Sequence, residues 1–132
     1  MTENEFLTQV IELSHLLRWR VAHFRGVPIL RKNGTVRYQT PVQADGAGFP
    51  DLVLVNREKK RVIYAELKSD KGCIRPEQNR WLDDLSAAGQ EVYLWRPKDS
   101  DDIIKILQTE YTQAEYPPKP AMTTPAPIRR AG

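Results

Sequence analysis

The chain has 132 residues, of which 40% are hydrophobic and 28% charged, and its formal net charge is +3. This length gives room for one domain with a moderate core, and the net charge alone is weak evidence for a nucleic-acid partner. The single cysteine, Cys73, excludes an intrachain disulfide and a cysteine-based zinc site. No apolar run approaches the roughly 20 residues needed to span a bilayer. The acidic N-terminus lacks the regions of a signal peptide, so the default expectation is a cytoplasmic protein.

The first predicted element is an amphipathic helix from about residue 3 to residue 18. Apolar side chains recur there at helical spacing, namely Phe6, Val10, Leu13 and Leu17. The next segment, residues 19–24, is rich in β-favouring residues and predicts a first strand.

A basic segment without any acidic residue follows, over residues 18–44. Its cations are Arg18, Arg20, Arg25, Arg31, Lys32 and Arg37. Within it, Asn33-Gly34 is a turn pair between β-favouring residues, which predicts a hairpin over residues 29–38. Such a basic field attracts phosphates, so we expect this arm to lie over a nucleic-acid backbone; ordinary surface solubility is the alternative. The residues expected to bind the nucleic acid are Arg25, Arg31, Lys32 and Arg37, with Lys71 and Arg75 from a later loop.

Two strands predicted at residues 51–55 and 61–66 carry the most informative side chains of the chain. The link between them is short and polar, so the second strand can return antiparallel beside the first. Asp51, at the start of the first strand, then lies opposite Glu66 and Lys68, at the end of the second. Residues separated in the sequence are thereby expected to meet in space.

Glu66 and Lys68 are two residues apart and leave a strand by the same face, while Leu67 between them points into the core. Two carboxylates with an ammonium suit phosphodiester hydrolysis. Hard oxygen ligands suit Mg²⁺ or Mn²⁺, which polarises a phosphate and lowers the pKa of a bound water. Lys68 would orient the nucleophile or bind a phosphoryl oxygen. Taken alone, Glu-x-Lys is usually a solvated ion pair and Asp after Pro a turn residue; their ordered combination favours a metal site.

The remaining elements are a helix over residues 76–88, a strand over residues 91–95 and a last helix over residues 99–107. Proline at the first turn and glycine after the last suit the bounds of the first of these helices. Gln78 and Trp81 share one side of it, and Trp81 is expected in the core.

The predicted order is α-β-hairpin-β-β-α-β-α. A helical crossover between strands favours an α/β fold with a mixed sheet flanked by helices. Proline is frequent from Tyr116 onward, so we expect a domain over residues 1–112 and a flexible tail over residues 113–132.

The order and spacing of several motifs resemble the VRR-NUC branch of the PD-(D/E)XK nuclease superfamily, especially its small phage and bacterial members. The motifs are Gly48-Phe49-Pro50-Asp51, Ala65-Glu66-Leu67-Lys68, Pro76-Glu77-Gln78 with Trp81, Ala88-Gly89, and Val92 with Trp95-Arg96-Pro97. The resemblance runs from the first helix to about Leu107 and leaves the arm and the tail outside. It implies a restriction-endonuclease-like fold of order α-β-β-β-α-β-α with the hairpin arm inserted. Arg18 departs from the glycine common before Trp19, which should alter a turn.

The resemblance also implies roles for individual residues. Asp51 and Glu66 would be metal ligands, with the Leu67 carbonyl as a third, and Lys68 the catalytic lysine. Gln78 would contact the active site. Some superfamily members add a glutamate from the first helix, a role open here to Glu12 or Glu5. Stand-alone members resemble Holliday-junction resolvases and tend to pair, which implies a homodimer.

The leading expectation is therefore a Mg²⁺- or Mn²⁺-dependent DNA endonuclease of a phage or its bacterial host, selective for branched, flapped or junction DNA. A non-catalytic DNA- or junction-binding module with a nuclease fold is the main alternative. A protein-interaction domain that uses the proline-rich tail is a third. The choice of DNA over RNA rests on the resemblance alone, and the preferred DNA structure stays open.

Overall fold

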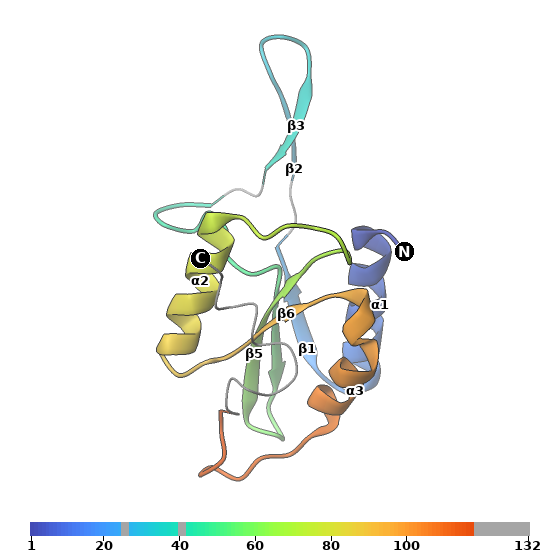
Figure 1. The fold of residues 1–132 in the computed structure, drawn as a ribbon, viewed down its shortest axis with the longest axis vertical. Coiled ribbons are helices and arrows are strands. Elements are labelled where there is room, and N and C mark those ends of the chain that lie inside the picture. The colour runs from blue at the N-terminus through green and yellow to red at the C-terminus, as the bar shows by residue number, and fades with distance from the viewer. Residues whose placement is uncertain (25–26, 40–41, 118–132) are drawn as a thin grey trace.

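The computed structural model describes residues 1–24, 27–39 and 42–117 (Figure 1). The elements in chain order are α1 (Glu3–Leu16), β1 (Arg20–His23), β2 (Val27–Leu30), β3 (Val36–Gln39), β4 (Leu52–Asn56), β5 (Arg61–Leu67), α2 (Pro76–Ala87), β6 (Glu91–Trp95), the 3₁₀ turn η1 (Pro97–Asp99) and α3 (Ser100–Gln108).

The body of the molecule is a four-stranded mixed sheet in the order β1-β4-β5-β6. β4 pairs antiparallel with both β1 and β5, whereas β5 and β6 are parallel and are joined through α2. Helix α2 lies on one side of the sheet and α1 and α3 on the other, and the β2–β3 hairpin projects away from the body (Figure 1). The expected α/β class, with a mixed sheet flanked by helices, is confirmed. The more specific restriction-endonuclease-like classification stays a prediction.

Alternation along β5 divides the core in two and decides where Glu66 points. Ile63, Ala65 and Leu67 are buried in the cluster that faces α1 and α3. Tyr64 packs instead in the smaller cluster under α2. Because side chains alternate along a strand, Glu66 belongs to the α2 face together with Tyr64.

Helix α1 ends at Leu16, and the turn that follows contains Arg18 with a φ of 71°. Glycine adopts this left-handed conformation most readily. Arg18, which stands where the resembled family commonly has glycine, therefore lies in a turn, as expected. The turn brings Trp19 into the core, where its indole N–H donates to the Leu107 carbonyl at 3.0 Å.

The chain keeps contact with the body beyond residue 112. The Tyr116 hydroxyl donates to the Val62 carbonyl at 2.8 Å and accepts from the Val62 N–H at 3.1 Å. Residue 116 is thereby held against the start of β5, and most of the predicted tail, residues 118–132, lies outside the described residues. Among the helices of the described part, none is long and apolar enough to cross a membrane.

Candidate active site

The trio predicted from the sequence comes together at one end of the central strands. β4 and β5 pair with Leu52 opposite Ala65, so Asp51 lies beside Glu66 one step further. An Asp51 carboxylate oxygen accepts a hydrogen bond from the Leu67 N–H at 2.9 Å. The Lys68 ammonium is 3.9 Å from a Glu66 carboxylate oxygen. Strand pairing and one backbone hydrogen bond thus fix the relative position of the carboxylates.

Gln78 also reaches this group, from the first turn of α2. Its side-chain amide N–H donates to Glu66 Oε2 at 2.9 Å, and its carbonyl accepts from the Arg75 N–H at 2.9 Å. The other oxygen of Glu66, Oε1, is buried and, in the ionised carboxylate, has no hydrogen-bond partner among the described residues; the Glu66 and Asp51 carboxyl groups share a hydrogen bond only when one of them is protonated. A buried acceptor without a partner is costly, which marks it as a position where a ligand would be stabilising.

Burial raises the pKa of both carboxyl groups. For Glu66, which is 1% exposed, burial and then the neighbouring Asp51 raise the pKa to about 9, and Lys68 opposes the shift. For Asp51, burial also raises the pKa, against the opposing hydrogen bond from the Leu67 N–H. Two adjacent carboxylates with little solvent resist a second negative charge unless a cation is present.

The donor set fits a hard divalent cation. Asp51 and Glu66 supply carboxylate oxygens, Glu66 Oε1 is free to accept, and the Leu67 carbonyl lies at the end of the same strand. Among the described residues, no group of three or more His, Cys, Asp or Glu side chains is arranged to hold a metal. Two carboxylates, a backbone oxygen and water suit Mg²⁺, which keeps several of its waters when protein-bound.

The two first-helix glutamates considered from the sequence lie elsewhere. Glu5 closes a capping box with Thr2, with hydrogen bonds of 2.7 and 3.1 Å, and this contact lowers its pKa. Glu12 is on α1, outside the cavities that Asp51 lines. Glu3 lines a cavity together with Asp51, and its charge contributes to the raised pKa of Glu66. Of the α1 glutamates, it is Glu3 that the structure places at a cavity with Asp51, and a role for Glu12 or Glu5 at the site stays an untested expectation.

Aromatic rings hold the segment that leads into Asp51. The Phe49 ring makes edge-to-face contacts with Phe24, Tyr64 and Trp81, at centroid distances of 5.6, 6.2 and 5.1 Å. The Trp81 indole N–H donates to the Asp45 carbonyl at 2.9 Å. Trp81 therefore packs against this segment and anchors it to α2, but it is only half-buried and lies outside both core clusters, so the expected core position is not found.

Gly48 lets the same segment approach α2 closely. Its φ is +85°, and a Cβ at this position would lie 2.7 Å from the backbone of Glu77. A side chain is therefore excluded both by the backbone conformation and by the space. The glycine of the Gly-Phe-Pro-Asp motif thus has a packing reason.

Sequence reasoning missed a contact that organises the loop after Lys68. The Arg96 guanidinium donates to the carbonyls of Ser69, Gly72 and Asp70 at 2.7, 2.8 and 3.4 Å. The Lys68 N–H donates to the Trp95 carbonyl at 3.0 Å. The available signal was the position of Arg96 directly after the predicted strand over residues 91–95, which the structure pairs with β5.

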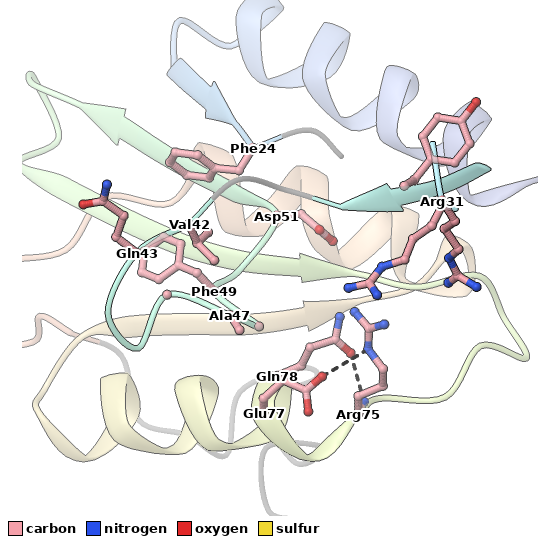
Figure 2. A pocket seen from close by; sticks show the side chains of 14 residues that line it. Phe24, Arg31, Val42, Gln43, Ala47, Phe49, Asp51, Arg75, Glu77 and Gln78 are labelled. Atoms are coloured by element: carbon pink, nitrogen blue, oxygen red, sulfur yellow. Dashed lines mark hydrogen bonds and ion pairs between the residues drawn. The ribbon is translucent and has the colours of Figure 1, made fainter. Parts of the chain in front are cut away.

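Basic residues of the hairpin and of the α2 start surround the entrance to the site. A cavity of about 740 Å³ is lined by Asp51, Gln78, Arg31, Arg37 and Arg75, among others. Figure 2 shows Arg31 reaching from the hairpin toward Arg75 and Gln78, with Asp51 on the wall beside them. Cations from two distant parts of the chain thus line the same cavity as Asp51.

The other basic residues expected at the interface are placed differently. Lys32 and Lys71 are exposed and do not line this cavity. Arg25 lies outside the described residues. The structure therefore gathers half of the six expected cations at the site, and these three are arginines, which can bind a phosphate with two hydrogen bonds.

These features agree with a comparison to known protein families. The VRR-NUC domain family matches residues 30–99, more than half of the chain, including Asp51, Glu66, Lys68 and Gln78. The chain therefore belongs to the VRR-NUC domain family, whose domain is of the nuclease type. The match begins within the hairpin arm, which the motif-based resemblance left outside, and ends before α3. No curated protein and no solved structure was found to match the chain.

Proposed function

We propose that this protein is a divalent-metal-dependent DNA endonuclease that hydrolyses phosphodiester bonds. The observation that carries the proposal is the pairing of Asp51 with Glu66, whose Oε1 is buried without a partner in the described part of the chain, beside Lys68. A purely structural carboxylate would be hydrogen-bonded or solvated at both oxygens. The basic cavity that Asp51 lines gives the polyanionic substrate a place to bind.

Each residue has a task that its contacts support. Gln78 holds one oxygen of Glu66, and the Leu67 N–H holds one oxygen of Asp51. Asp51, Glu66 and the Leu67 carbonyl would hold Mg²⁺ or Mn²⁺, which when bound supplies polarisation of the phosphoryl oxygen and a lower pKa for an attacking water. Lys68, positioned by its backbone, donates to a phosphoryl oxygen or orients the attacking water.

Substrate binding falls to the arginines around the cavity. Arg31, Arg37 and Arg75 would neutralise phosphates on either side of the scissile bond. No helix of the described part offers a base-reading face directed into this cavity, whose helical lining comes from the first turn of α2. Recognition of DNA shape and backbone, as at branches, flaps and junctions, is the selectivity that this arrangement favours. We include in the proposal a homodimer that places two cuts symmetrically.

The test is a panel of labelled DNAs, comprising duplex, nicked, flapped and four-way structures with matching RNAs, incubated with Mg²⁺, Mn²⁺ or EDTA. Cleavage is expected only with metal, and Asp51→Asn, Glu66→Gln and Lys68→Met should each abolish it. Residues of the same chemistry outside the site provide the controls, Glu12→Gln and Lys105→Met, which should cleave at wild-type rates.

Two outcomes would contradict the proposal. Wild-type cleavage by the site variants would remove the assignment of these residues. DNA binding without product in Mn²⁺ would favour a non-catalytic binding module. The mass of the full chain in solution, measured by light scattering with and without DNA, tests the homodimer separately.

A further inference from the structure

The β2–β3 hairpin has two chemically different faces. Leu30 is paired with Val36 across the two strands, and Ile29 with Arg37. Because side chains alternate along a strand, Leu30, Val36 and Tyr38 share one face, while Ile29 and Arg37 share the other. The three residues of the first face are 74%, 55% and 73% exposed. The hairpin thus leaves an apolar face open to solvent.

Tyr38 occupies a special position on this face, because it also borders the active site. It lines the cavity of about 740 Å³ that contains Gln78, and a second cavity of about 760 Å³ that contains Glu3. Asp51 lines both cavities as well. A largely exposed aromatic ring therefore lies where two hollows meet at a proposed catalytic carboxylate.

We propose that Tyr38 stacks on an unpaired nucleobase next to the scissile phosphate, which makes an unpaired nucleotide part of the substrate. This inference rests on the proposed nuclease function and specifies its substrate class. Bases inside a duplex are stacked on each other and hide their faces, whereas an unpaired base presents its face to a protein aromatic. Tyr38 would thereby select branched or flapped DNA without reading its sequence.

Charge identifies a nucleic acid as the occupant of this surface. Residues 18–44 carry six cations and no acid, and Arg31 and Arg37 line the cavity that Tyr38 borders. A second copy of the same hairpin would bring these cations against each other, which is unfavourable. A polyanion that offers phosphates to the arginines and a base to Tyr38 satisfies both kinds of side chain.

The experiment measures coupling between Tyr38 and the base, by fluorescence anisotropy with Ca²⁺ in place of Mg²⁺ so that DNA is bound without being cut. The DNA is a flapped duplex whose branch-point unpaired nucleotide is either adenine or an abasic analogue. The wild-type chain is expected to bind the abasic DNA about tenfold more weakly, in the range typical of base–aromatic stacking. Tyr38→Ala should weaken binding of the adenine DNA by a similar factor and bind both DNAs equally.

Two variants guard against loss of folding as the explanation. Tyr38→Phe keeps the ring and should retain the preference for adenine. Val36→Ala removes apolar surface from the same face outside both cavities and should leave the preference unchanged. All variants should bind a fully paired duplex with the affinity of the wild type.

The outcomes separate this inference from the proposed function. If Tyr38→Ala weakens binding of the adenine and abasic DNAs equally, or of neither, the stacking role is overturned even where cleavage is normal. If Tyr38→Ala instead abolishes self-association without changing base preference, the face is a dimer contact and the inference fails. If the wild type cleaves no DNA in Mg²⁺ or Mn²⁺, the nuclease proposal fails, while the coupling in Ca²⁺ still reports on Tyr38.

Discussion

Replacement of Glu66 by glutamine is expected to increase the free energy of unfolding in the absence of a divalent cation, although it removes a residue proposed for catalysis. In the folded wild type, burial and the adjacent Asp51 raise the pKa of Glu66 to about 9, so the carboxyl stays protonated at neutral pH. In the unfolded chain the same group is exposed and ionised. The folded state therefore bears a cost that a neutral glutamine avoids.

The size of this effect follows from linkage between proton binding and folding. An unperturbed glutamate has a pKa of 4.5, and below that pH the group is neutral in both states and the cost vanishes. Between 4.5 and about 9 the stability of the wild type decreases as the pH rises. At pH 7 the upper bound is about 3 kcal/mol, at roughly 1.36 kcal/mol per pH unit. Relaxation around a coupled pair reduces this, so we expect about 1–3 kcal/mol, or about 4–12 °C in melting temperature.

Thermal melts followed by circular dichroism at pH 5, 7 and 8.5 in EDTA would measure this difference in stability between Glu66→Gln and the wild type. The difference in melting temperature between Glu66→Gln and wild type should widen with pH, whereas Glu12→Gln, outside the site, should follow the wild type throughout. Mg²⁺ or Mn²⁺ should stabilise the wild type and leave Glu66→Gln unchanged. A Glu66→Gln variant that is no more stable than wild type at pH 8.5 would refute the desolvated-carboxylate reasoning.

Three further tests, which use five substitutions, concern the surroundings of the site and the opposite end of the sheet. Arg96→Lys should lower the single-turnover cleavage rate by about 10- to 100-fold, because the carbonyls of the loop after Lys68 lose their contacts with the guanidinium. The affinity for DNA in Ca²⁺ should change little. Equal losses in rate and affinity would contradict this prediction. Gly48→Ala should lower the free energy of unfolding, measured in urea, by about 2 kcal/mol, and Gly89→Ala should lower it by about 1 kcal/mol. Both glycines have a positive φ, but only Gly48 has no space for a Cβ atom. Arg61→Met should lower the free energy of unfolding by about 3–5 kcal/mol, because it leaves the buried Glu91 without its cation. Adding Glu91→Leu to the same chain should recover part of that loss. No recovery would show that the ion pair itself provides the stability.

The meeting of Asp51 and Glu66 could be predicted because it depends on local rules. Two β-favouring segments joined by a short polar link form a hairpin, and the hairpin alone places the head of one strand beside the end of the other. Periodicity and link length are sufficient for this step. The contact of Gln78 with Glu66 was expected from the family resemblance alone, because the eight residues between β5 and α2 do not define by themselves where the helix begins over the strand.

Other contacts depend on how distant elements pack, which the sequence does not specify locally. The rotation of α1 against the sheet places Glu3 rather than Glu5 at the cavity. The contact of Arg96 with the Ser69 carbonyl requires that the loop after β6 and the loop after β5 lie side by side at the same end of the sheet. The return of Tyr116 to β5 spans 54 residues, and the prolines nearby indicated only a tail. Each depends on tertiary packing, and none leaves a periodic signal.

The two ends of β5 show how a structural charge differs from a functional one. At one end, buried Arg61 donates to both oxygens of Glu91 and to the carbonyls of Ile106 and Thr109, and the Tyr93 hydroxyl donates to the same carboxylate. At the other end, Glu66 is as deeply buried, yet one of its oxygens has no partner among the described residues.

Burial of a charge is tolerated when partners compensate for lost solvent, and the Arg61 end meets that condition within the chain itself. The Glu66 end meets it only in part, through Gln78 and Lys68, so without a cation the raised pKa keeps this carboxyl neutral, and its ionised form would need a group from outside the chain. The difference between these two carboxylates lies in hydrogen-bond satisfaction and not in burial. This difference is the reason for proposing the chemistry at the Glu66 end of the sheet and a stabilising role at the other.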